Sequence, residues 1–249
     1  MKKRNLVKRR TVIAAGITSL AGFLLYRRIK TSKAPTYGNI LRMGDAFTYE
    51  AQRSLLPARS LVKEYTHDEI SSFPATGTTD PGDPSAQSFS KEYAALQKNG
   101  FSGWRLSIEG LVAKPGMYSL SDLQKFPSRT QITRHTCEEG WTAIAEWTGV
   151  QLSRVLEHAG INSRARYINF YAYDQNWDSI DMLDAFHPQT ILAYNMNGNV
   201  LPTEHGYPLR VRVETQIGYK SVKYLQRIVV TDKFIDPPYG SEWAWYNGI

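Results

Sequence analysis

Thr133-Arg-His-Thr-Cys-Glu-Glu-Gly-Trp141 is the stretch from which both the fold and the chemistry of this 249-residue chain can be inferred, because it contains the single cysteine. Residues 131–136 are predicted to form a strand that leads directly into Cys137. A lone cysteine is most often a small buried apolar side chain. Here Arg134 and His135 precede it, and cationic neighbours favour the thiolate, which binds metals or attacks electrophiles. We therefore expect a metal-binding or reactive thiol at the end of a strand.

The cysteine count also limits the kinds of redox centre that this chain could carry. One cysteine cannot form an intramolecular disulfide, a Cys-rich zinc site or an iron–sulfur cluster. The sequence has no Cys-x-x-Cys-His motif, which excludes a covalently attached c-type haem. Any electrons used in a redox reaction must therefore be exchanged with another molecule.

Two further motifs follow along the chain. The first, Leu201-Pro-Thr-Glu-His-Gly-Tyr-Pro-Leu-Arg210, comes after an Asn197-Gly198 turn and brings His205 and Arg210 near one another beside a strand. The second, Gly218-Tyr-Lys-Ser-Val-Lys-Tyr224, offers backbone donors, a hydroxyl and two lysines, which suit a phosphate or another anion. Its composition fits a solvated basic strand end equally well, so this motif alone leaves both interpretations open.

Around these motifs the pattern predicts an α+β fold with mixed sheets, because strands and short helices interleave without a regular strand–helix–strand rhythm. Residues 31–100 are expected to form a polar approach segment, with a Pro- and Gly-rich loop over 73–84. Helices are expected over 119–126, 150–159 (stopped by Gly160) and 181–186. Strands are expected over 104–108, 131–136, 167–173, 209–213 and 225–230, with a hairpin over 191–200.

The net charge of +7 belongs to the N-terminus. Residues 1–33 contain ten Lys or Arg and no acid, whereas 34–249 contain 20 basic and 23 acidic residues. Binding of nucleic acid, which needs a basic face on the folded domain, therefore has no support. Arg9-Arg10 followed by an apolar run resembles a twin-arginine export signal. We expect 1–33 to be an export signal or a retained membrane anchor, and 34–249 to be the catalytic domain on the periplasmic side.

Taken in order, the three motifs resemble the molybdopterin-binding domain of the sulfite oxidase family, over about Ile70 to Asp232. The resemblance is closest to haem-free bacterial members such as the periplasmic methionine-sulfoxide reductase catalytic subunit. It implies a mixed-sheet domain with one molybdenum per chain, held by a single pterin dithiolene and by the thiolate of Cys137. It also implies a group of cofactor-binding residues, namely Thr76, Gly77, His205, Arg210, Lys220, Ser221 and Lys223.

What the resemblance implies for activity is oxygen-atom transfer on a small sulfur-containing or similar substrate. Arg134 and His135 are the expected catalytic groups beside Cys137, with Tyr173 and Asp174 as further candidates. A separate haem or other electron-transfer protein is the expected partner, and a monomer is expected. Two alternatives stay open: a cofactor-free, membrane-anchored binding module that keeps the fold, and a thiol hydrolase that uses Cys137 without a metal.

Overall fold

The computed structural model of the chain describes residues 40–55 and 60–235. The chain divides into two compact units, Met1–Pro57 and Ala58–Ile249. Helix α2 (Ile40–Leu55) belongs to the first unit, and residues 60–235 form what we call the body. Within the described ranges, no helix is long and apolar enough to cross a membrane. The predicted export signal or anchor over 1–33 lies outside the described residues, so its role and its boundary with the catalytic domain stay predictions.

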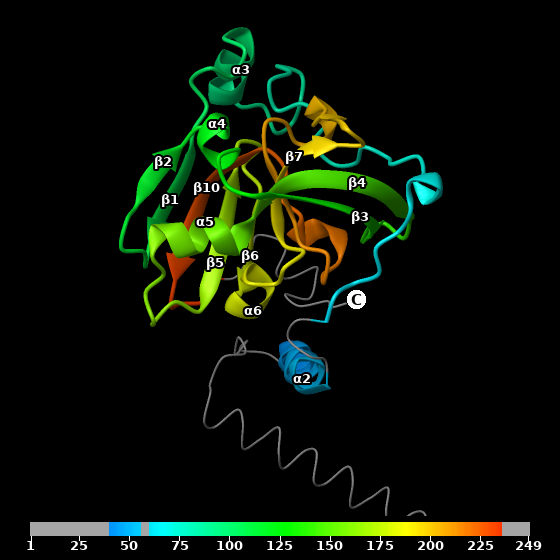
Figure 1. The fold of residues 1–249 in the computed structure, drawn as a ribbon, viewed down its shortest axis with the longest axis vertical. Helices are drawn as coiled ribbons and strands as arrows, with labels where there is room; N and C mark the ends of the chain where they lie inside the picture. Colours follow the sequence, from blue (N-terminus) through cyan, green and yellow to red (C-terminus); the bar gives the residue numbers. More distant parts are fainter. Residues whose placement is uncertain (1–39, 56–59, 236–249) are drawn as a thin grey trace, which may run out of the picture. The chain divides into compact units, whose positions relative to one another are not determined.

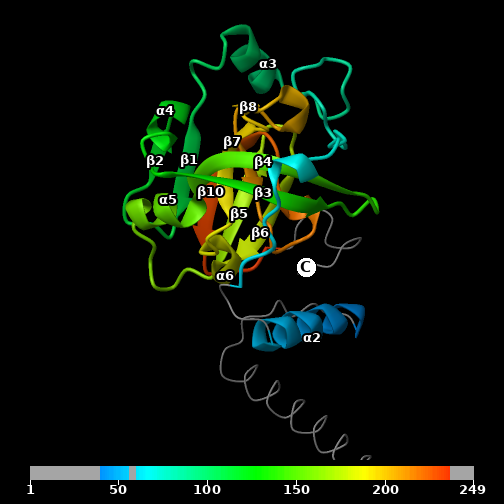
Figure 2. The ribbon, with the colours of Figure 1, turned by 45° about the vertical axis from the view of Figure 1, so that its right-hand side comes forward.

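The body contains two five-stranded sheets, one mixed and one antiparallel (Figures 1 and 2). In the first sheet the strand order is β2-β1-β10-β5-β6, and only β1 and β10 are parallel among its pairs. Helix α5 (Leu152–Ala159) lies across this sheet in both views. The strands are β1 (Leu106–Gly110), β2 (Gly116–Tyr118), β5 (Tyr167–Ala172), β6 (Trp177–Asp181) and β10 (Leu225–Thr231).

The second sheet runs β3-β4-β7-β8, with β9 also paired to β7. Its strands are β3 (Ser128–Thr136), β4 (Thr142–Gln151), β7 (Ile191–Met196), β8 (Asn199–Val200) and β9 (Arg210–Arg212). Two short helices precede β1, namely η1 (His67–Glu69) and α3 (Lys91–Lys98). Four others connect strands: α4 (Leu120–Leu123), α6 (Met182–Ala185), η2 (Thr203–His205) and η3 (Gly218–Lys220). All pairs within this sheet are antiparallel, and alternate residues of each strand therefore face opposite sides.

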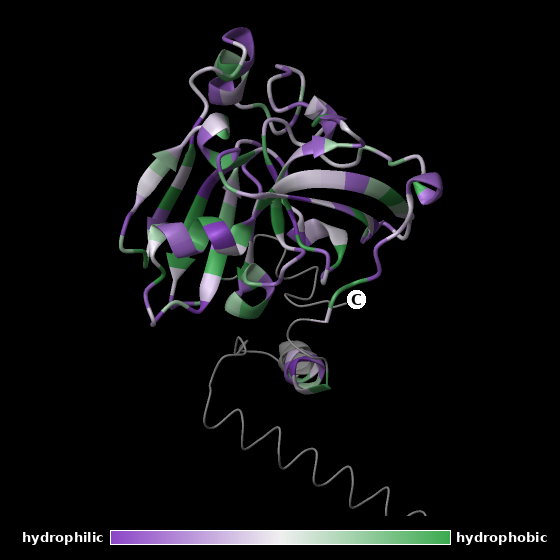
Figure 3. Cartoon of the chain, in the orientation of Figure 1, coloured by the Kyte–Doolittle hydropathy of each residue, from purple (hydrophilic) through white to green (hydrophobic). Residues whose placement is uncertain are grey.

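The apolar core joins the two sheets and explains why α5 is helical. Val155, Leu156 and Ala159 are buried on one face of α5, and they pack with apolar side chains of β1, β5, β7 and β10. The other face of α5 is hydrophilic, whereas the strands behind it are mostly hydrophobic (Figure 3). A second, smaller cluster around Trp147 covers the opposite side of the second sheet. Both faces of that sheet are therefore packed, which fixes the positions of side chains on either side of it.

The sequence predictions of mixed sheets, of the helix ending at Gly160 (φ 74°) and of the hairpin at Asn197-Gly198 (φ 50° and 74°) are confirmed. The Ser119 cap is confirmed too, although α4 ends at Leu123 instead of residue 126. Helices α2 and α3, within the predicted approach segment, were not predicted, nor were β2, β4 and β6. Strand β6 was missed because it contains three buried polar residues, Asp178, Ser179 and Asp181. Burial of the first two depends on Lys220, distant in sequence, whose ammonium donates to the Asp178 carboxylate and to the Ser179 carbonyl.

Candidate active site

One cavity of about 800 Å³ brings together the three motifs quoted above. Four segments of the second half of the chain line it: the turn after β3, the turn between β5 and β6, the loop around η2, and η3 with the residues after it. The early loop over residues 73–88 supplies the rest of the lining. The predicted residues Thr76, Gly77, His135, Cys137, Asp174, His205, Arg210, Ser221 and Lys223 all line this cavity.

Cys137 lies in a tight turn directly after β3. Its backbone N–H donates to the carbonyl of Trp141 (2.9 Å), and its own carbonyl accepts from Gly140 (3.1 Å). The thiol is buried, with the backbone N–H of Glu139 at 3.5 Å and a carboxylate oxygen of Glu138 at 3.6 Å. Burial, together with the two carboxylates, raises the pKa of the Cys137 thiol to about 11, against the opposing effect of the Glu139 N–H.

That environment corrects the expectation that cationic neighbours favour the thiolate. Arg134 is exposed and does not line the cavity, because alternation along β3 places it on the face opposite to His135. His135 is neutral: burial, with the charges of Arg212 and Arg210 and with His205, lowers its pKa to about 2. The Cys137 thiol is therefore protonated in this environment at neutral pH, and a metal ion bound to it would deprotonate it outright. A metal-free thiol hydrolase would need a base that takes the proton of the thiol. His135 does not fill this role, since its Nδ1 accepts a hydrogen bond from Arg212 and not from the thiol.

His205 and His135 are linked by an aromatic cluster centred on Phe73. The Phe73 ring lies 5.1 Å from His135, 5.6 Å from Trp141, 5.4 Å from Trp147 and 5.4 Å from His205. His205 closes η2, and burial together with Arg210 lowers its pKa to about 4, so its ring is neutral at pH 7. Both rings are therefore neutral, and neither supplies a charge to the cavity.

Arg210 is a buried cation without an acidic partner among the described residues. Its guanidinium donates to the carbonyls of His205 (2.9 Å) and Ser221 (2.9 Å), and it lies over the ring of Trp147. Its Nε is buried and makes no hydrogen bond. Burial, with the nearby Arg212, lowers the pKa of Arg210 to about 9. An uncompensated buried guanidinium with a spare donor is a site for an anion.

Lys223 ties the early loop to the rest of the cavity. Its ammonium donates to the carbonyls of Thr76 (2.9 Å), Thr78 and Glu204 (3.1 Å). Burial, with the charge of Arg210, lowers the pKa of Lys223 to about 8. Like Arg210, it forms no ion pair within the part of the chain that the structure describes. The two cations of the cavity are therefore held in place by backbone carbonyls, and an anion would add the missing counter-charge.

Besides Arg134, two of the predicted residues lie outside the cavity. Lys220 does not line the cavity: its ammonium is buried against the Asp178 carboxylate (2.6 Å) and the Ser179 carbonyl (3.0 Å). Tyr173 is buried in the apolar core, where its ring packs against that of Tyr93. The expected cofactor role of Lys220 and catalytic role of Tyr173 are thus not supported by their placement.

The residues that line the cavity fit a cofactor with a thiophilic metal and a phosphate. The Cys137 thiol is a soft ligand, while Arg210 Nε and the Ser221 hydroxyl are donors for an anion and Lys223 adds a positive charge. Sequence reasoning missed Glu138, Glu139 and Phe73 as cavity residues. Their proximity to the motifs was a usable signal for all three, whereas nothing in the sequence indicated the buried Arg212 beside His135.

Comparison with known proteins gives a consistent result. Residues 94–239 match the family described as "Oxidoreductase molybdopterin binding domain". A protein-methionine-sulfoxide reductase subunit of Azospira oryzae is 37% identical over 152 residues, covering 59% of this chain and 56% of that protein. A protein-methionine-sulfoxide reductase catalytic subunit of Ralstonia nicotianae is 32% identical over 168 residues, covering 59% and 50%.

Longer and structural matches agree with these. The catalytic subunit of Pseudomonas syringae is 30% identical over 250 residues, covering 89% of this chain and 71% of that protein. Among solved structures, the sulfane dehydrogenase SoxCD of Paracoccus pantotrophus matches with a TM-score of 0.52 and 28% identity, covering 55% of this chain and 40% of that one. The chain spans about half the length of the first two relatives.

Proposed function

Because the chain belongs to the family of oxidoreductases that share the molybdopterin-binding domain, we propose that it holds one molybdenum cofactor in its cavity and transfers an oxygen atom from a small S-oxide. The cofactor, when bound, supplies a metal centre that accepts an oxygen atom and cycles by two electrons. The observation that carries the proposal is that the buried thiol of Cys137 and the uncompensated guanidinium of Arg210 line the same cavity.

The residues of the chain divide the task of holding this group. Cys137 supplies the protein thiolate to the metal, which offsets its unfavourable burial as an anion. Arg210, Lys223 and the Ser221 hydroxyl bind the anionic part of the cofactor, and His205 contributes a neutral polar contact. The backbone of Thr76 and Gly77 lies in the loop that Lys223 fastens across the cavity.

The charges around Cys137 support a neutral S-oxide over a sulfur oxyanion. Glu138 and Glu139 line the cavity next to the thiol, whereas Arg134 points away from it. An anionic substrate would therefore meet two carboxylates and no cation from this segment of the chain. The names of the relatives, methionine-sulfoxide reductases, point the same way. In the balanced reaction a sulfoxide, two electrons and two protons give a thioether and water.

Electrons for this reaction come, in this proposal, from a second protein. The chain has one cysteine, and the described residues contain no cluster of His, Cys, Asp or Glu that could hold a further metal centre. A haem-containing electron-transfer protein is the proposed donor. The cationic and apolar segment over 1–33 supports export to the periplasm, either as a cleaved signal or as a tether to the inner membrane. We propose a monomer as the working unit.

Elemental analysis tests the proposal most directly. Protein from cells that make the cofactor should contain about one molybdenum per chain, and it should reduce a neutral S-oxide with a chemically reduced dye as the electron donor. Cys137→Ser should abolish this activity, whereas Arg134→Gln, which changes an exposed residue of the same strand, should leave it unchanged. Well-folded native protein without molybdenum would instead support a binding module that keeps the fold without catalysis.

A further inference from the structure

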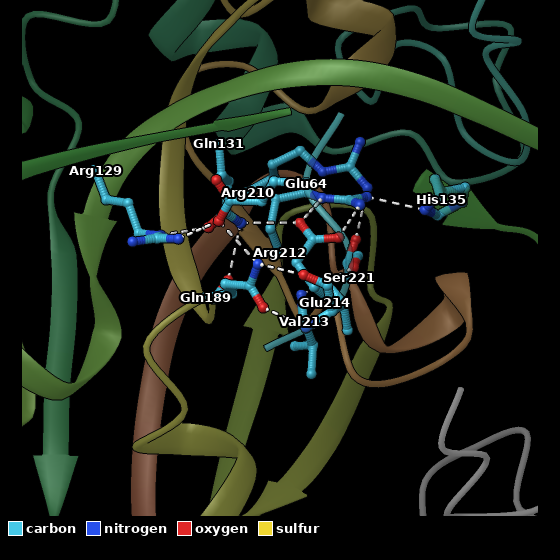
Figure 4. Close-up of polar contacts among 11 residues, drawn as sticks. Glu64, Arg129, Gln131, His135, Gln189, Arg210, Arg212, Val213, Glu214 and Ser221 are labelled. Carbon is cyan, nitrogen blue, oxygen red and sulfur yellow. Dashed lines mark hydrogen bonds and ion pairs between the residues drawn. The ribbon is translucent and has the colours of Figure 1, made fainter. Parts of the chain in front are cut away.

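A row of buried polar side chains runs along one face of the second sheet, next to the cavity (Figure 4). It includes His135 and Gln131 on β3, Arg212 on β9, and Glu214 just after β9. Arg212 and Glu214 are each only 1% exposed in their side chains, and they form an ion pair at 2.8 Å. A buried ion pair contributes little net stability compared with apolar residues of the same size. We therefore ask which neighbouring side chains this ion pair orients.

Arg212 distributes its donors between two partners. Its Nε and Nη2 donate to the two carboxylate oxygens of Glu214 (3.0 and 2.8 Å), and Gln131 also donates to that carboxylate (3.1 Å). The remaining nitrogen, Nη1, lies 2.9 Å from Nδ1 of His135. A guanidinium has no acceptor, so Nδ1 must accept this hydrogen bond. The proton of the neutral imidazole is therefore on Nε2.

The rest of the imidazole ring is held just as firmly. Phe73 and Trp141 lie against it at 5.1 and 5.4 Å between ring centroids. Gly218 leaves room for its Cε1–Nε2 edge, since a Cβ at this position would lie 2.4 Å from Cε1 and 2.5 Å from Nε2. Within residues 60–235, Nε2 has no hydrogen-bond partner, and His135 lines the cavity two residues before Cys137.

We propose that Arg212, held by Glu214, is a positioning residue. It fixes His135 as a neutral Nε2–H donor that faces the group bound in the cavity beside Cys137. The proposal rests on the proposed function for what the donor meets there: an oxygen atom of the cofactor or of the S-oxide beside the metal. A neutral donor suits this place because a protonated His135 would be a third cation beside Arg210 and Arg212, whereas a neutral N–H can still donate a hydrogen bond to an oxygen atom in the cavity.

Nitrogen-15 NMR of the histidines tests the placement of the proton in the full chain without use of the cofactor. In native protein His135, assigned by its loss in His135→Gln, should show a protonated Nε2 and an unprotonated Nδ1. Arg212→Met alone leaves Glu214 buried and unpaired, so it can fail to fold. The paired variant Arg212→Met/Glu214→Leu removes both charges, and in it the two tautomers should mix. Arg129→Met, at the partly exposed end of the same network, is the matched control and should keep the native pattern.

The holoenzyme tests what the donor does. In the paired variant kcat for a neutral S-oxide should fall by roughly 10- to 100-fold, as for other groups that orient a residue beside a metal. KM and molybdenum content should change little, the Mo(V) electron paramagnetic resonance signal should shift, and Arg212→Lys should restore part of kcat.

A native His135 with its proton on Nδ1, or a paired variant with native tautomer and native kcat, would overturn the proposal. Native protein without molybdenum would refute the proposed function, and the NMR experiment would still decide separately whether Arg212 fixes the ring.

Discussion

Gly218→Ala is expected to destabilise the protein through one specific collision, with the ring of His135. The added Cβ would lie 2.4 Å from His135 Cε1 and 3.2 Å from the Thr136 carbonyl. Because carbon atoms pack at about 3.5–4.0 Å, the ring has to move by roughly 1 Å. A movement of that size stretches the 2.9 Å hydrogen bond from Arg212 past the distance of about 3.2 Å at which such bonds weaken.

The expected loss of stability follows from two costs, steric overlap with the ring and loss of the hydrogen bond from Arg212. Movement of the ring reduces one of them only by increasing the other. Overpacking a well-packed site costs about 1–3 kcal/mol. Loss of a hydrogen bond to a charged group costs about 1.5–3 kcal/mol. Because movement of the ring relieves the first at the expense of the second, we expect Gly218→Ala to lower the free energy of unfolding by about 2–3 kcal/mol.

Urea unfolding of four proteins measures whether His135 is the cause: native, Gly218→Ala, His135→Ala and the double variant. If the ring causes the loss, Gly218→Ala should cost much less in the His135→Ala background. Gly140→Ala is the control, since its φ of +90° strains the backbone while no atom lies within 4 Å of the added Cβ. Its cost should be the same in both backgrounds. An equal cost of Gly218→Ala in both backgrounds would refute the placement of the His135 ring.

Three further predictions follow from the charges. Lys220→Met should destabilise the protein by about 3–5 kcal/mol in urea unfolding, because it leaves Asp178 buried and unpaired, whereas Lys220→Met/Asp178→Leu should recover most of the loss; equal losses would place Lys220 elsewhere. Arg210→Met should lower molybdenum content per chain, whereas Arg134→Gln should not, as elemental analysis of both variants can check. For His205, the pKa falls from 6.5 to about 4 on folding, so only the unfolded state takes up its proton as the pH drops through that window, and stability falls. Stability of His205→Gln, measured by urea unfolding from pH 6.5 to 4, should fall less steeply, and an equal slope would contradict the prediction.

The fold was predictable where local signals were strong. Asn197-Gly198 indicated the hairpin and Gly160 the end of α5, because both are positions with positive φ that these residues adopt readily. Strand β6 could not be predicted in this way, since its pattern of Trp177 to Asp181 is polar although most of it is buried. Burial of such a strand depends on partners from another part of the chain, which a local pattern does not contain.

The sequence predicted which residues line the cavity better than it predicted what each of them does. The motif around Cys137 correctly indicated a cavity residue, yet the reason given, cationic neighbours, was wrong. Alternation along β3 already separates Arg134 from His135, so strand geometry alone could have placed the arginine outside. The neutral state of His135 was beyond such reasoning, because it results from burial and from Arg212, 77 residues further along the chain.

The partners of four cations, Arg210, Arg212, Lys220 and Lys223, decide whether each charge is available to a ligand. Arg212 and Lys220 are fully buried, and each has an acid at hydrogen-bond distance, so their charges are already balanced within the protein. Arg210 and Lys223 are held by carbonyl oxygens, which orient a cation without neutralising it. The chain thus places two uncompensated positive charges in the cavity and none beside Cys137. A ligand bound there is expected to be anionic near Arg210 and Lys223, and uncharged where it meets Glu138 and the thiol. Because Asp178 lies 42 residues before Lys220, only the fold distinguishes a balanced lysine from an unbalanced one three residues away.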